Sequence, residues 1–418
     1  MRIVMVTALF PPEFSGGTER VTLAHARALA RLGHDVRIVS GTAGDAPVGA
    51  SLVEGLPVHR IERPHDANPL VADEILRARV ADAVRNVDVI HVQHNWTFGA
   101  GLVPELSQLA PVVLSLHDFS VVCPRFFRVP HHGATCPDGD AFADDDLEDC
   151  VQCVAPDLGG NRESVQARLF DRLEAWRADL NAASRILVPS RTHLVRLVDL
   201  IDLDGKARIA RPGVCHTFSG EVPRPKPWDG TGPLKILHLG RRSLAKGTLD
   251  LVRAVAALPE GTVELLCLGG AEPGLDRRLT AIAGKTAIRL EGAYDALDLE
   301  QAASACHLAA LPSRLPESYA LAVDEALALG LPVWASSADA ARERFGDGSL
   351  RVLPAQDPSV WTQALHELLE HPDELLDAFE SLPDSLPTAN DAALELLQFY
   401  EPLVTRTDLD AGTSKRAG

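Results

Sequence analysis

The sequence predicts an α/β protein built from two Rossmann-like domains, each organised around a parallel sheet. Short apolar segments of strand length alternate with segments whose apolar residues recur at helical spacing, and this alternation is typical of βαβ units. Residues 219–233, which are rich in proline and glycine, interrupt the alternation before it starts again. A chain of 418 residues is also long enough for two domains that each have a core of their own.

The first domain is expected over residues 1–218. It begins with RIVMVT at 2–7, a buried strand, and continues with a helix from Thr18 to Leu32 that a glycine ends. The strand expected at 35–40 completes a βαβ unit and implies a parallel sheet. Further buried strands of this sheet are predicted at 87–93, 111–118 and 184–190.

After the linker at 219–233, the second domain is expected over residues 234–388. Its strands are predicted at 234–240, 263–269, 287–292, 307–313 and 331–336, with a helix at 248–258. Two α/β domains in succession favour a ligand-binding cleft between them. A helix at 389–404 is expected to cross back to the first domain, and residues 405–418 are expected to form a frayed tail.

Charge and hydropathy narrow the range of partners. The formal net charge of −18 argues against nucleic acid, whose phosphates require a surplus of lysine and arginine. No apolar run approaches the roughly 20 residues of a membrane span, so no transmembrane segment is expected, while peripheral membrane contact stays open. The N-terminus is interpreted as a strand and not as a signal peptide, which makes the cytoplasm the expected location.

A basic turn follows the first strand of the second domain. In LGRRSLAKG (239–247), Arg241, Arg242 and Lys246 lie after a strand end, and strand ends in such sheets face the ligand crevice. These cations are therefore placed to meet negative charge, and Gly269 ends the neighbouring strand at the same edge. A solvated basic turn is the alternative interpretation.

Two carboxylates flank the start of a predicted helix in LPSRLPESYALAVDEALALGLPVWAS. Glu317 precedes a helix that begins near Tyr319, and Glu325 lies two turns into it on roughly the same side. The free amides and positive dipole end of such a helix favour an anion ahead of it. The pair suits a ligand with hydroxyls at both ends and phosphates between them. The alternative is a dipole-favoured Glu317 and a solvated Glu325.

The first domain has candidate residues after three strands. Gly16, Gly17 and Glu19 follow the first strand in FSGGTE, and His94 and Asn95 follow the strand at 87–93. LSLHDFSVVCPR adds His117 and Asp118 at another strand end. A histidine in such a position is by itself more often a structural hydrogen-bonding group than a catalyst.

With these motifs in this order, the sequence resembles the retaining glycosyltransferases of the GT-B group, a family related to sucrose synthase and to bacterial mannosyl- and N-acetylglucosaminyltransferases. The resemblance covers most of the chain, from TALFPPEFSGGTERV to EALALGLPV. It implies the GT-B fold, in which two Rossmann-like domains face each other across a cleft. It also implies transfer of a hexosyl group from a nucleotide-diphosphate sugar to a hydroxyl-bearing acceptor, with retention and without a catalytic metal.

The family motifs imply roles for individual residues. G-R-x4-K-G matches Gly240 to Gly247 and gives Arg241 and Lys246 the donor diphosphate, while E-x7-E gives Glu317 the donor sugar and Glu325 the ribose. Similar enzymes carry a histidine at the position of His117 that contacts the sugar near the reacting carbon. The remaining implied residues are donor-side Gly16, Gly17, Gly269, Ser318, Tyr319, Ala320 and Leu321, and acceptor-side Glu19, His94, Asn95 and Asp118. The usual E-G-F-G-L reads ESYAL here, which puts the identity of the donor sugar in doubt.

Four of the seven cysteines, Cys123, Cys136, Cys150 and Cys153, form C-x12-C-x13-C-x2-C within an insertion at 123–153. Four thiols with a C-x2-C pair fit a structural, tetrahedral zinc site, and a similar insertion after His-Asp occurs in a subset of the family. Unpaired thiols or an iron–sulfur site stay open. Acidic runs at 137–140 and 144–146 in the same loop are interpreted as solvated.

Two other functions were weighed. A nucleotide-sugar epimerase with the same architecture would need no acceptor, and a non-catalytic nucleotide-sugar-binding protein would keep the fold without transfer. The match of Arg241, Lys246, Glu317 and Glu325 to the motifs argues against the second. A dinucleotide-dependent dehydrogenase is disfavoured because FSGGTE lacks the G-x-G-x-x-G spacing.

Overall fold

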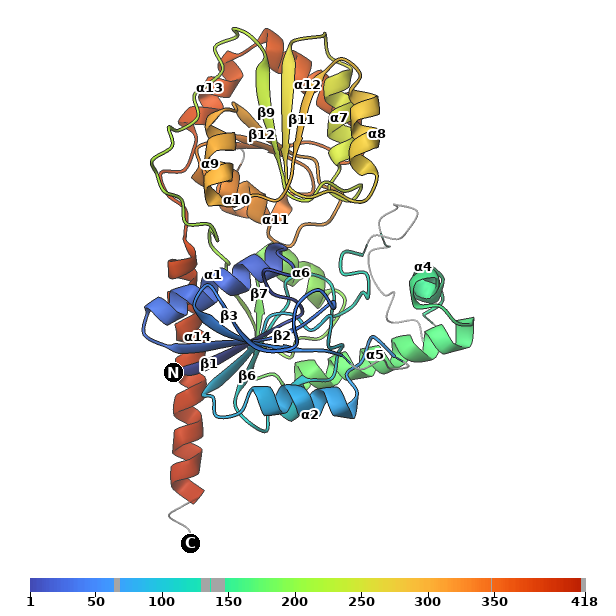
Figure 1. The fold of residues 1–418 in the computed structure, drawn as a ribbon, viewed down its shortest axis with the longest axis vertical. Helices are drawn as coiled ribbons and strands as arrows, with labels where there is room; N and C mark the ends of the chain where they lie inside the picture. The colour runs from blue at the N-terminus through green and yellow to red at the C-terminus, as the bar shows by residue number, and fades with distance from the viewer. Residues whose placement is uncertain (64–67, 129–135, 137–146, 347, 415–418) are drawn as a thin grey trace. The chain divides into compact units, whose positions relative to one another are not determined.

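The computed structural model describes residues 1–63, 68–128, 136, 147–346 and 348–414 (Figure 1). The expected acidic runs at 137–140 and 144–146 and the last residues of the expected tail, 415–418, lie outside the described residues. The chain forms two compact units. Unit one contains residues 1–215 and 387–418, and unit two contains residues 216–386.

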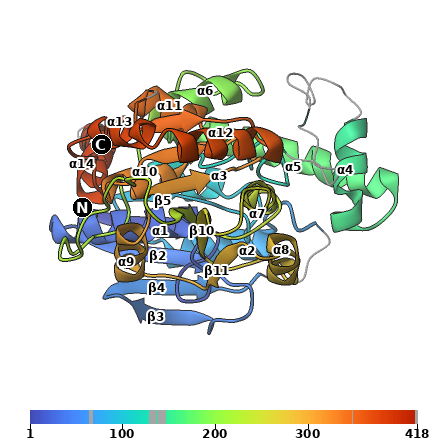
Figure 2. The ribbon, with the colours of Figure 1, turned by 90° about the horizontal axis from the view of Figure 1, so that it is seen from above.

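Unit one is built on an eight-stranded sheet of order β3-β4-β2-β1-β5-β6-β7-β8. All neighbours are parallel except β3, which pairs antiparallel with β4 at the edge (Figure 2). The strands are β1 Arg2–Thr7, β2 Asp35–Gly41, β3 Gly49–Val53, β4 Leu56–Ile61, β5 Val89–Val92, β6 Val112–Ser115, β7 Arg185–Val188 and β8 Ala207–Ile209. The helices are α1 Gly17–Arg31, α2 Glu74–Ala83, α3 Val103–Leu106, α4 Glu148–Leu158, α5 Arg162–Ala182, α6 Arg191–Val198 and α14 Ala389–Ser414.

The sheet of unit one is buried on both faces, which explains the continuous apolar run of its first strand. In β1, Val4 and Val6 lie in one core with residues of α2 and α5, while Ile3 and Met5 lie in another core with residues of α1 and α14. Side chains of a strand alternate between faces, so a strand covered on both sides must be apolar throughout. The prediction of buried parallel strands is therefore confirmed.

Unit two has a six-stranded sheet of order β11-β10-β9-β12-β13-β14, and every pair is parallel. Its strands are β9 Leu234–Leu239, β10 Val263–Leu268, β11 Ala287–Glu291, β12 Leu308–Leu311, β13 Val333–Ala335 and β14 Leu350–Val352. Its helices are α7 Thr248–Ala256, α8 Leu275–Ala283, α9 Ala296–Ser304, α10 Leu321–Ala328, α11 Asp339–Phe345, α12 Pro358–Glu370 and α13 Asp373–Glu380. One core joins the sheet to α7, α8 and α12, and the other joins it to α9, α10 and α11.

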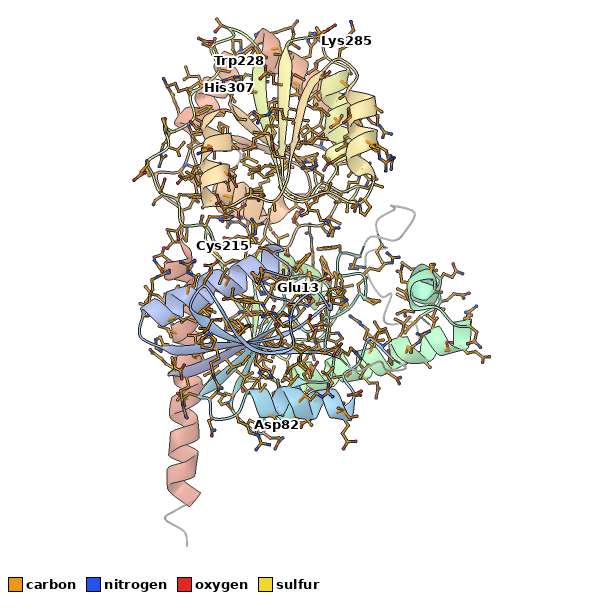
Figure 3. The ribbon with its side chains drawn as sticks, in the orientation of Figure 1. Glu13, Asp82, Cys215, Trp228, Lys285 and His307 are labelled. Atoms are coloured by element: carbon orange, nitrogen blue, oxygen red, sulfur yellow. The ribbon has the colours of Figure 1, made fainter. Side chains whose placement is uncertain are left out.

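Several sequence predictions need correction. Most strands are shorter than expected by one to four residues, because pairing stops where the loops that carry polar side chains begin. Helix α14 continues to Ser414, ten residues beyond its expected end, so the frayed tail is wrong for 405–414. The proline-rich stretch is packed where it contains Trp228 (Figure 3), because this side chain is only 6% exposed and lies in a core of unit two.

The C-terminal helix α14 is fastened to unit one by a buried tyrosine. The Tyr400 side chain is fully buried in the core between the sheet and α1, and its hydroxyl is hydrogen-bonded to Nδ1 of His91 on β5. The chain leaves unit one after residue 215 and returns to it at residue 387, after the 171 residues of unit two. Helix α14 therefore contributes to the core of unit one although it is distant in sequence.

We predict that Tyr400→Ala lowers the free energy of unfolding of unit one by roughly 3–5 kcal/mol, as expected for removal of a large buried aromatic side chain. Leu394→Ala on the same helix is the control, since Leu394 is exposed and should change stability by less than ~0.5 kcal/mol. Urea unfolding followed by tryptophan fluorescence measures both values. Equal stability losses in the two variants would contradict this packing.

Candidate functional site

In unit two, the loops after β9 and β12 meet at the carboxyl edge of the sheet. Nζ of Lys246 lies 2.6 Å from Oε1 of Glu317, which joins the basic turn to the first of the two predicted acids. Both side chains are partly accessible, with 36% of Lys246 and 17% of Glu317 exposed. A pair this accessible contributes only ~0–1 kcal/mol to stability, so its main consequence is the placement of the two groups.

Close backbone packing and a second ion pair hold these loops together. A Cβ atom at Gly247 would lie 1.9 Å from the carbonyl oxygen of Pro312, and the φ of Gly247 is +69°, so only glycine fits. Arg314 forms a two-pronged ion pair with Asp250 at 2.7 Å for both bonds, and its amide donates to the carbonyl of Ala245. The approach of Lys246 to Glu317 is thus built into the main chain.

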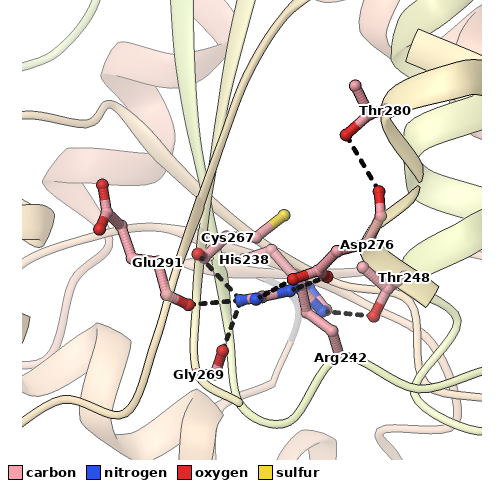
Figure 4. Close-up of polar contacts among 8 residues, drawn as sticks. All are labelled: His238, Arg242, Thr248, Cys267, Gly269, Asp276, Thr280 and Glu291. Atoms are coloured by element: carbon pink, nitrogen blue, oxygen red, sulfur yellow. Dashed lines mark hydrogen bonds and ion pairs between the residues drawn. The ribbon is translucent and has the colours of Figure 1, made fainter. Parts of the chain in front are cut away.

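The two arginines of the basic turn have different environments, and Figure 4 shows the contacts of Arg242. Arg242 is buried, forms a two-pronged ion pair with Asp276 at 2.8 Å, and donates to the carbonyls of Gly269 and Glu291. It ties strand ends to α8, so the expectation that Arg242 faces a ligand is wrong. Arg241 is exposed and makes no hydrogen bond or ion pair with the described part of the chain.

Gly269 lies directly against the start of the basic turn. Its φ is +136°, and a Cβ atom there would lie 2.2 Å from the carbonyl oxygen of Gly240. Two glycines at adjacent strand ends keep this part of the edge free of side chains. Glycine is therefore required at Gly269 by the close approach of the two main chains and by its positive φ.

The second predicted acid is buried. Glu325 lies within α10 and is 1% exposed, and its Oε1 is 3.5 Å from Nε2 of His216. The alternative of a solvated Glu325 is therefore wrong. The His216 ring stacks on Phe218 with ring centroids 6.0 Å apart, and the centroid of the tilted Tyr294 ring lies 6.1 Å from that of His216.

The turn between Glu317 and Glu325 is held by a buried arginine. Arg344 forms an ion pair with Asp324, donates to the carbonyl of Tyr319 and lies 3.8 Å from the Tyr319 ring centroid. The Tyr319 hydroxyl donates to Asp324 at 2.8 Å, so this buried side chain has a structural role. Burial raises the pKa of Asp324, and the Arg344 charge opposes this effect.

Helix α10 begins one residue after Ala320, two residues later than predicted. Ala320 has a φ of +68°, a left-handed conformation in which a residue with a Cβ is strained by roughly 1–2 kcal/mol. Ser318 and Leu321, the other two donor-side residues of this turn, are partly exposed on either side of it. The clamp formed by Arg344, Asp324 and Tyr319 stabilises this turn, which explains how alanine occupies a place that favours glycine.

In unit one, the glycine loop forms the start of α1. Glu19 accepts from the amide of Gly16 at 3.1 Å and is buried, and a Cβ at Gly16 would lie 2.8 Å from both the Glu19 carboxylate and the Phe14 ring. Gly17, the first helical residue, is exposed. Burial raises the pKa of Glu19, while the neighbouring His94 charge lowers it.

His117 belongs to a chain of buried hydrogen bonds that starts at α14. His91 is bonded to Tyr400 and to Ser115, Gln93 lies 3.2 Å from His91, and Nε2 of His117 lies 2.7 Å from Oε1 of Gln93. Since an amide oxygen only accepts, Nε2 of His117 carries the proton. Burial lowers the pKa of His117 to about 3, which keeps the ring neutral near pH 7.

His94 and Asp118 form a second polar pair at the same edge. Nε2 of His94 is 3.2 Å from Oδ2 of Asp118, and the other carboxylate oxygen accepts from the amide of Ser120 at 2.7 Å. Burial would lower the pKa of His94, but the Asp118 carboxylate outweighs burial and raises it. Burial would raise the pKa of Asp118, but His94 and Ser120 lower it to about 2. Asn95 is buried, and its carbonyl accepts from the amides of Phe98 and Gly99.

The four cysteines of the insertion form no disulfides, and three of them affect the pKa of the fourth, Cys150. Burial and the neighbouring thiols of Cys123, Cys136 and Cys153 raise the pKa of Cys150 to about 11. Burial also raises the pKa of Cys123, and backbone hydrogen bonds from Arg125 and Arg128 oppose this effect. Within the described residues, however, no three His, Cys, Asp or Glu side chains are close enough to hold a metal ion as they stand.

The structure thus places the predicted residues in two groups, one within each unit. Unit two brings together Lys246, Glu317, Arg241, Gly269 and the turn that leads to Glu325. Unit one brings together Glu19, His94, Asp118 and His117 at the carboxyl edge of its sheet. No helix of the described chain is long and apolar enough to cross a membrane.

The sequence did not identify three residues that position the predicted site residues. Gln93 orients His117, His216 contacts Glu325, and Arg344 clamps the turn around Ala320. Gln93 is the last residue of the strand predicted at 87–93, so its position at a strand end was a detectable signal. The partners of His216 and Arg344 lie 109 and 20 residues away along the chain, and no local pattern joins them.

Two family models and one curated relative that match this chain all describe glycosyltransferases. Residues 15–218 match the model of Glycosyltransferase Family 4, and residues 233–371 match the model of Glycosyl transferases group 1. A curated D-inositol 3-phosphate glycosyltransferase from Xylanimonas cellulosilytica is 28% identical over 377 residues, which cover 85% of this chain and 84% of that protein.

Solved structures share the fold over the whole chain. Anabaena Alr3699/HepE in complex with UDP and glucose has a TM-score of 0.62 at 16% identity, with 99% of both chains covered. Sucrose-phosphate synthase from Thermosynechococcus elongatus has a TM-score of 0.60 at 17% identity, with 100% of both chains covered. Likeness at these identities shows the fold and confirms the predicted architecture of two α/β units.

The buried neutral histidines predict how stability depends on pH. Burial lowers the pKa of His193 and of His238 to about 4 and that of His117 to about 3, against about 6.5 in the unfolded chain. Their contribution to stability is complete above pH 6.5. Below pH 6.5 the unfolded chain binds protons that the folded chain does not, so the free energy of unfolding should fall steadily towards pH 4.

Chemical unfolding at pH 7.5, 6.5, 5.5 and 4.5 measures this loss. His193→Gln should reduce the loss between pH 6.5 and 4.5, because it removes one buried imidazole. His366→Gln, at an exposed position, is the control and should leave the pH dependence unchanged. A pH dependence that is identical in wild type and His193→Gln would show that His193 is not held neutral by burial.

Proposed function

We propose that this chain, which belongs to the glycosyltransferases with the GT-B fold, transfers a hexosyl group from a nucleotide-diphosphate sugar to a hydroxyl-bearing acceptor with retention of configuration. The observation that carries the proposal is the contact of 2.6 Å between Lys246 and Glu317. It unites the two motifs that resemble the donor-binding motifs of the retaining enzymes. The cytoplasm is the proposed location.

Lys246 and Arg241 bind the diphosphate in this proposal. Arg241 is exposed. The ammonium of Lys246 has three N–H donors and uses one of them in its hydrogen bond to Glu317, so it can also donate to a phosphate. The amides of Gly240 and Gly269 already donate to the carbonyls of Leu268 and Gly292, so this role falls to the two side chains. Two fixed cations stabilise charge on a departing diphosphate by preorganised electrostatics, and no divalent metal is required for this role.

Glu317 and His117 are proposed to orient the sugar, and Glu325 to hold the ribose. The carboxylate of Glu317 accepts hydroxyl hydrogen bonds and is held in place by Lys246. The neutral ring of His117 is fixed through Gln93, so it can form a directed hydrogen bond without adding charge. His216 positions Glu325 from 3.5 Å away.

The proposed step breaks the bond between the anomeric carbon of the sugar and the oxygen of the β-phosphate. A bond forms between the same carbon and the acceptor oxygen on the same face of the ring. The proton of the acceptor hydroxyl passes to the departing phosphate oxygen, so atoms and charge balance. Proximity of donor and acceptor supplies much of the acceleration.

The names of the relatives suggest donors and acceptors to test. One solved relative binds UDP and glucose, and the curated relative is named for D-inositol 3-phosphate. UDP-, GDP- and ADP-sugars are therefore the donors to screen. Incubation with the donor alone tests for an epimer and separates transfer from the epimerase alternative.

A structural zinc ion bound by Cys123, Cys136, Cys150 and Cys153 is part of the proposal. Four thiols are a donor set that suits zinc, and all four are free cysteines. The thiols of Cys123, Cys136 and Cys153 also act electrostatically on Cys150. Bound zinc would pin the insertion and would take no part in transfer, since four protein ligands leave no open position.

We predict that Lys246→Ala and Glu317→Gln each lower kcat by roughly 10²–10³-fold, because each removes a group that acts on the developing charge. Initial rates with a nucleotide sugar and an acceptor measure the loss. Lys285→Ala is a matched control, since Lys285 forms an exposed pair with Glu260 at 3.2 Å. Full transfer activity in either of the first two variants would refute the assignment.

We further predict that the purified protein contains about one equivalent of zinc, measured by inductively coupled plasma mass spectrometry. Cys150→Ser and Cys153→Ser should each lose the zinc and lower the thermal unfolding temperature. Cys215→Ser, outside the insertion, should keep both at the wild-type values. Absence of zinc and iron from the wild type, or retention of zinc in both variants, would rule out the site.

A further inference from the structure

Aromatic rings gather at the surface of unit one beside the pair formed by His94 and Asp118. The Phe126 ring lies 5.7 Å from the His94 ring and 5.8 Å from the Trp96 ring, both edge to face, and 6.4 Å from the Phe127 ring. Trp96 follows β5 and the two phenylalanines follow β6. We call Trp96, Phe126 and Phe127 the aromatic platform.

The platform is exposed to an extent that packing alone does not explain. Trp96 is 52% exposed and Phe127 is 40% exposed, in a chain with only 5% aromatic residues. Trp96, Phe127 and Phe126 are joined by ring contacts, so they form a continuous apolar surface. Such surfaces rimmed by polar groups are typical of ligand-binding grooves.

The backbone holds Phe126 in a conformation that phenylalanine disfavours. Its φ is +67°, in the left-handed region, where non-glycine residues other than asparagine and aspartate are uncommon. Its amide donates to the carbonyl of Cys123, and its carbonyl accepts from Phe119 at 2.8 Å. Strained backbone that the surroundings fix in this way is found preferentially at functional sites.

The basic groups beside the platform, His94, Arg125 and Arg128, each contact a carboxylate or an aromatic ring. Asp118 is ionised, and Glu19 acts electrostatically on both His94 and Asp118. Among the cations of the same loop, Arg125 is paired with Asp157 at 2.6 Å, and Arg128 lies over the Phe119 ring at 6.0 Å. A phosphate beside two carboxylates would be repelled, whereas hydroxyl groups could donate to them.

We propose that the platform is the acceptor subsite and that the acceptor is an uncharged saccharide whose pyranose ring stacks on Trp96. This inference rests on the proposed glycosyl transfer and adds the chemical class of the acceptor. A pyranose ring has C–H groups on its face and hydroxyls around its rim. Its face matches the rings of Trp96 and Phe127, and its rim matches His94 and the acidic groups.

The test is binding of methyl α-glucopyranoside, methyl α-mannopyranoside and methyl α-galactopyranoside to the full chain without donor, by saturation-transfer NMR. Glucose, mannose and galactose 6-phosphates are the charged counterparts. At least one methyl pyranoside should bind, and its charged counterpart should bind at least tenfold more weakly. Trp96→Ala should abolish binding, Trp96→Tyr should restore it in part, and Phe170→Ala, at an exposed position on α5, should leave it unchanged.

In transfer assays, Trp96→Ala should raise the acceptor KM by roughly tenfold, with kcat changed much less, because uniform binding is lost. Failure of every pyranoside to bind, tighter binding of the phosphates, or unchanged binding in Trp96→Ala would overturn the proposal. Sedimentation with phosphatidylcholine vesicles provides the rival outcome. Trp96-dependent vesicle binding without pyranoside binding would assign the platform to lipid and contradict us.

The two proposals can fail separately. If no nucleotide sugar is bound or consumed, glycosyl transfer fails whatever the platform binds. If a nucleotide sugar is consumed in a Lys246-dependent reaction but pyranosides do not bind or accept, glycosyl transfer stands and only the acceptor class is wrong.

Discussion

The close approach of two loops at the edge of the second sheet is the constraint on which the donor site depends. Gly247 passes so near Pro312 that no side chain fits, and the Asp250–Arg314 ion pair fastens the same loops. Lys246 and Glu317 meet as a consequence. The pair adds little to stability, but it fixes a cation and a carboxylate side by side on a rigid edge. Such an arrangement suits a ligand that carries phosphates next to hydroxyls.

In unit one, by contrast, the polar residues at the sheet edge are largely buried, and burial governs the protonation of His117. His91, Gln93 and His117 form a hydrogen-bonded chain anchored by Tyr400, so the last helix supports the polar edge of the first sheet. Burial holds His117 neutral, whereas His94 lies against an ionised Asp118. Two histidines at one edge therefore have different electrostatic roles, and the aromatic platform lies next to the charged pair.

The sequence predicted those features that depend on local pattern. Continuous apolar strands, helical spacing and glycine stops gave the parallel sheets and placed Lys246, Glu317 and His117 after strand ends. Features set by distant contacts were missed or misjudged. The sequence alone does not distinguish Arg242 from Arg241. In the structure, Arg242 is bonded to Asp276 and to the carbonyls of two other strand ends, whereas Arg241 is exposed. For Glu325 the spacing alone left a solvated position as the alternative to a ligand-binding one. The hairpin of β3 and β4 was not predicted despite its Glu54-Gly55 turn.

Calorimetric titration of the protein with UDP-, GDP- and ADP-glucose and GDP-mannose tests the donor site most directly. The account predicts saturable binding of at least one of these donors and a higher unfolding temperature in its presence, since a ligand of the native state stabilises it. Both effects should weaken strongly in Arg241→Ala and persist in Lys285→Ala, a control whose exposed side chain pairs with Glu260. Binding that is unchanged in Arg241→Ala, or no binding of any donor, would contradict a site built on the basic turn.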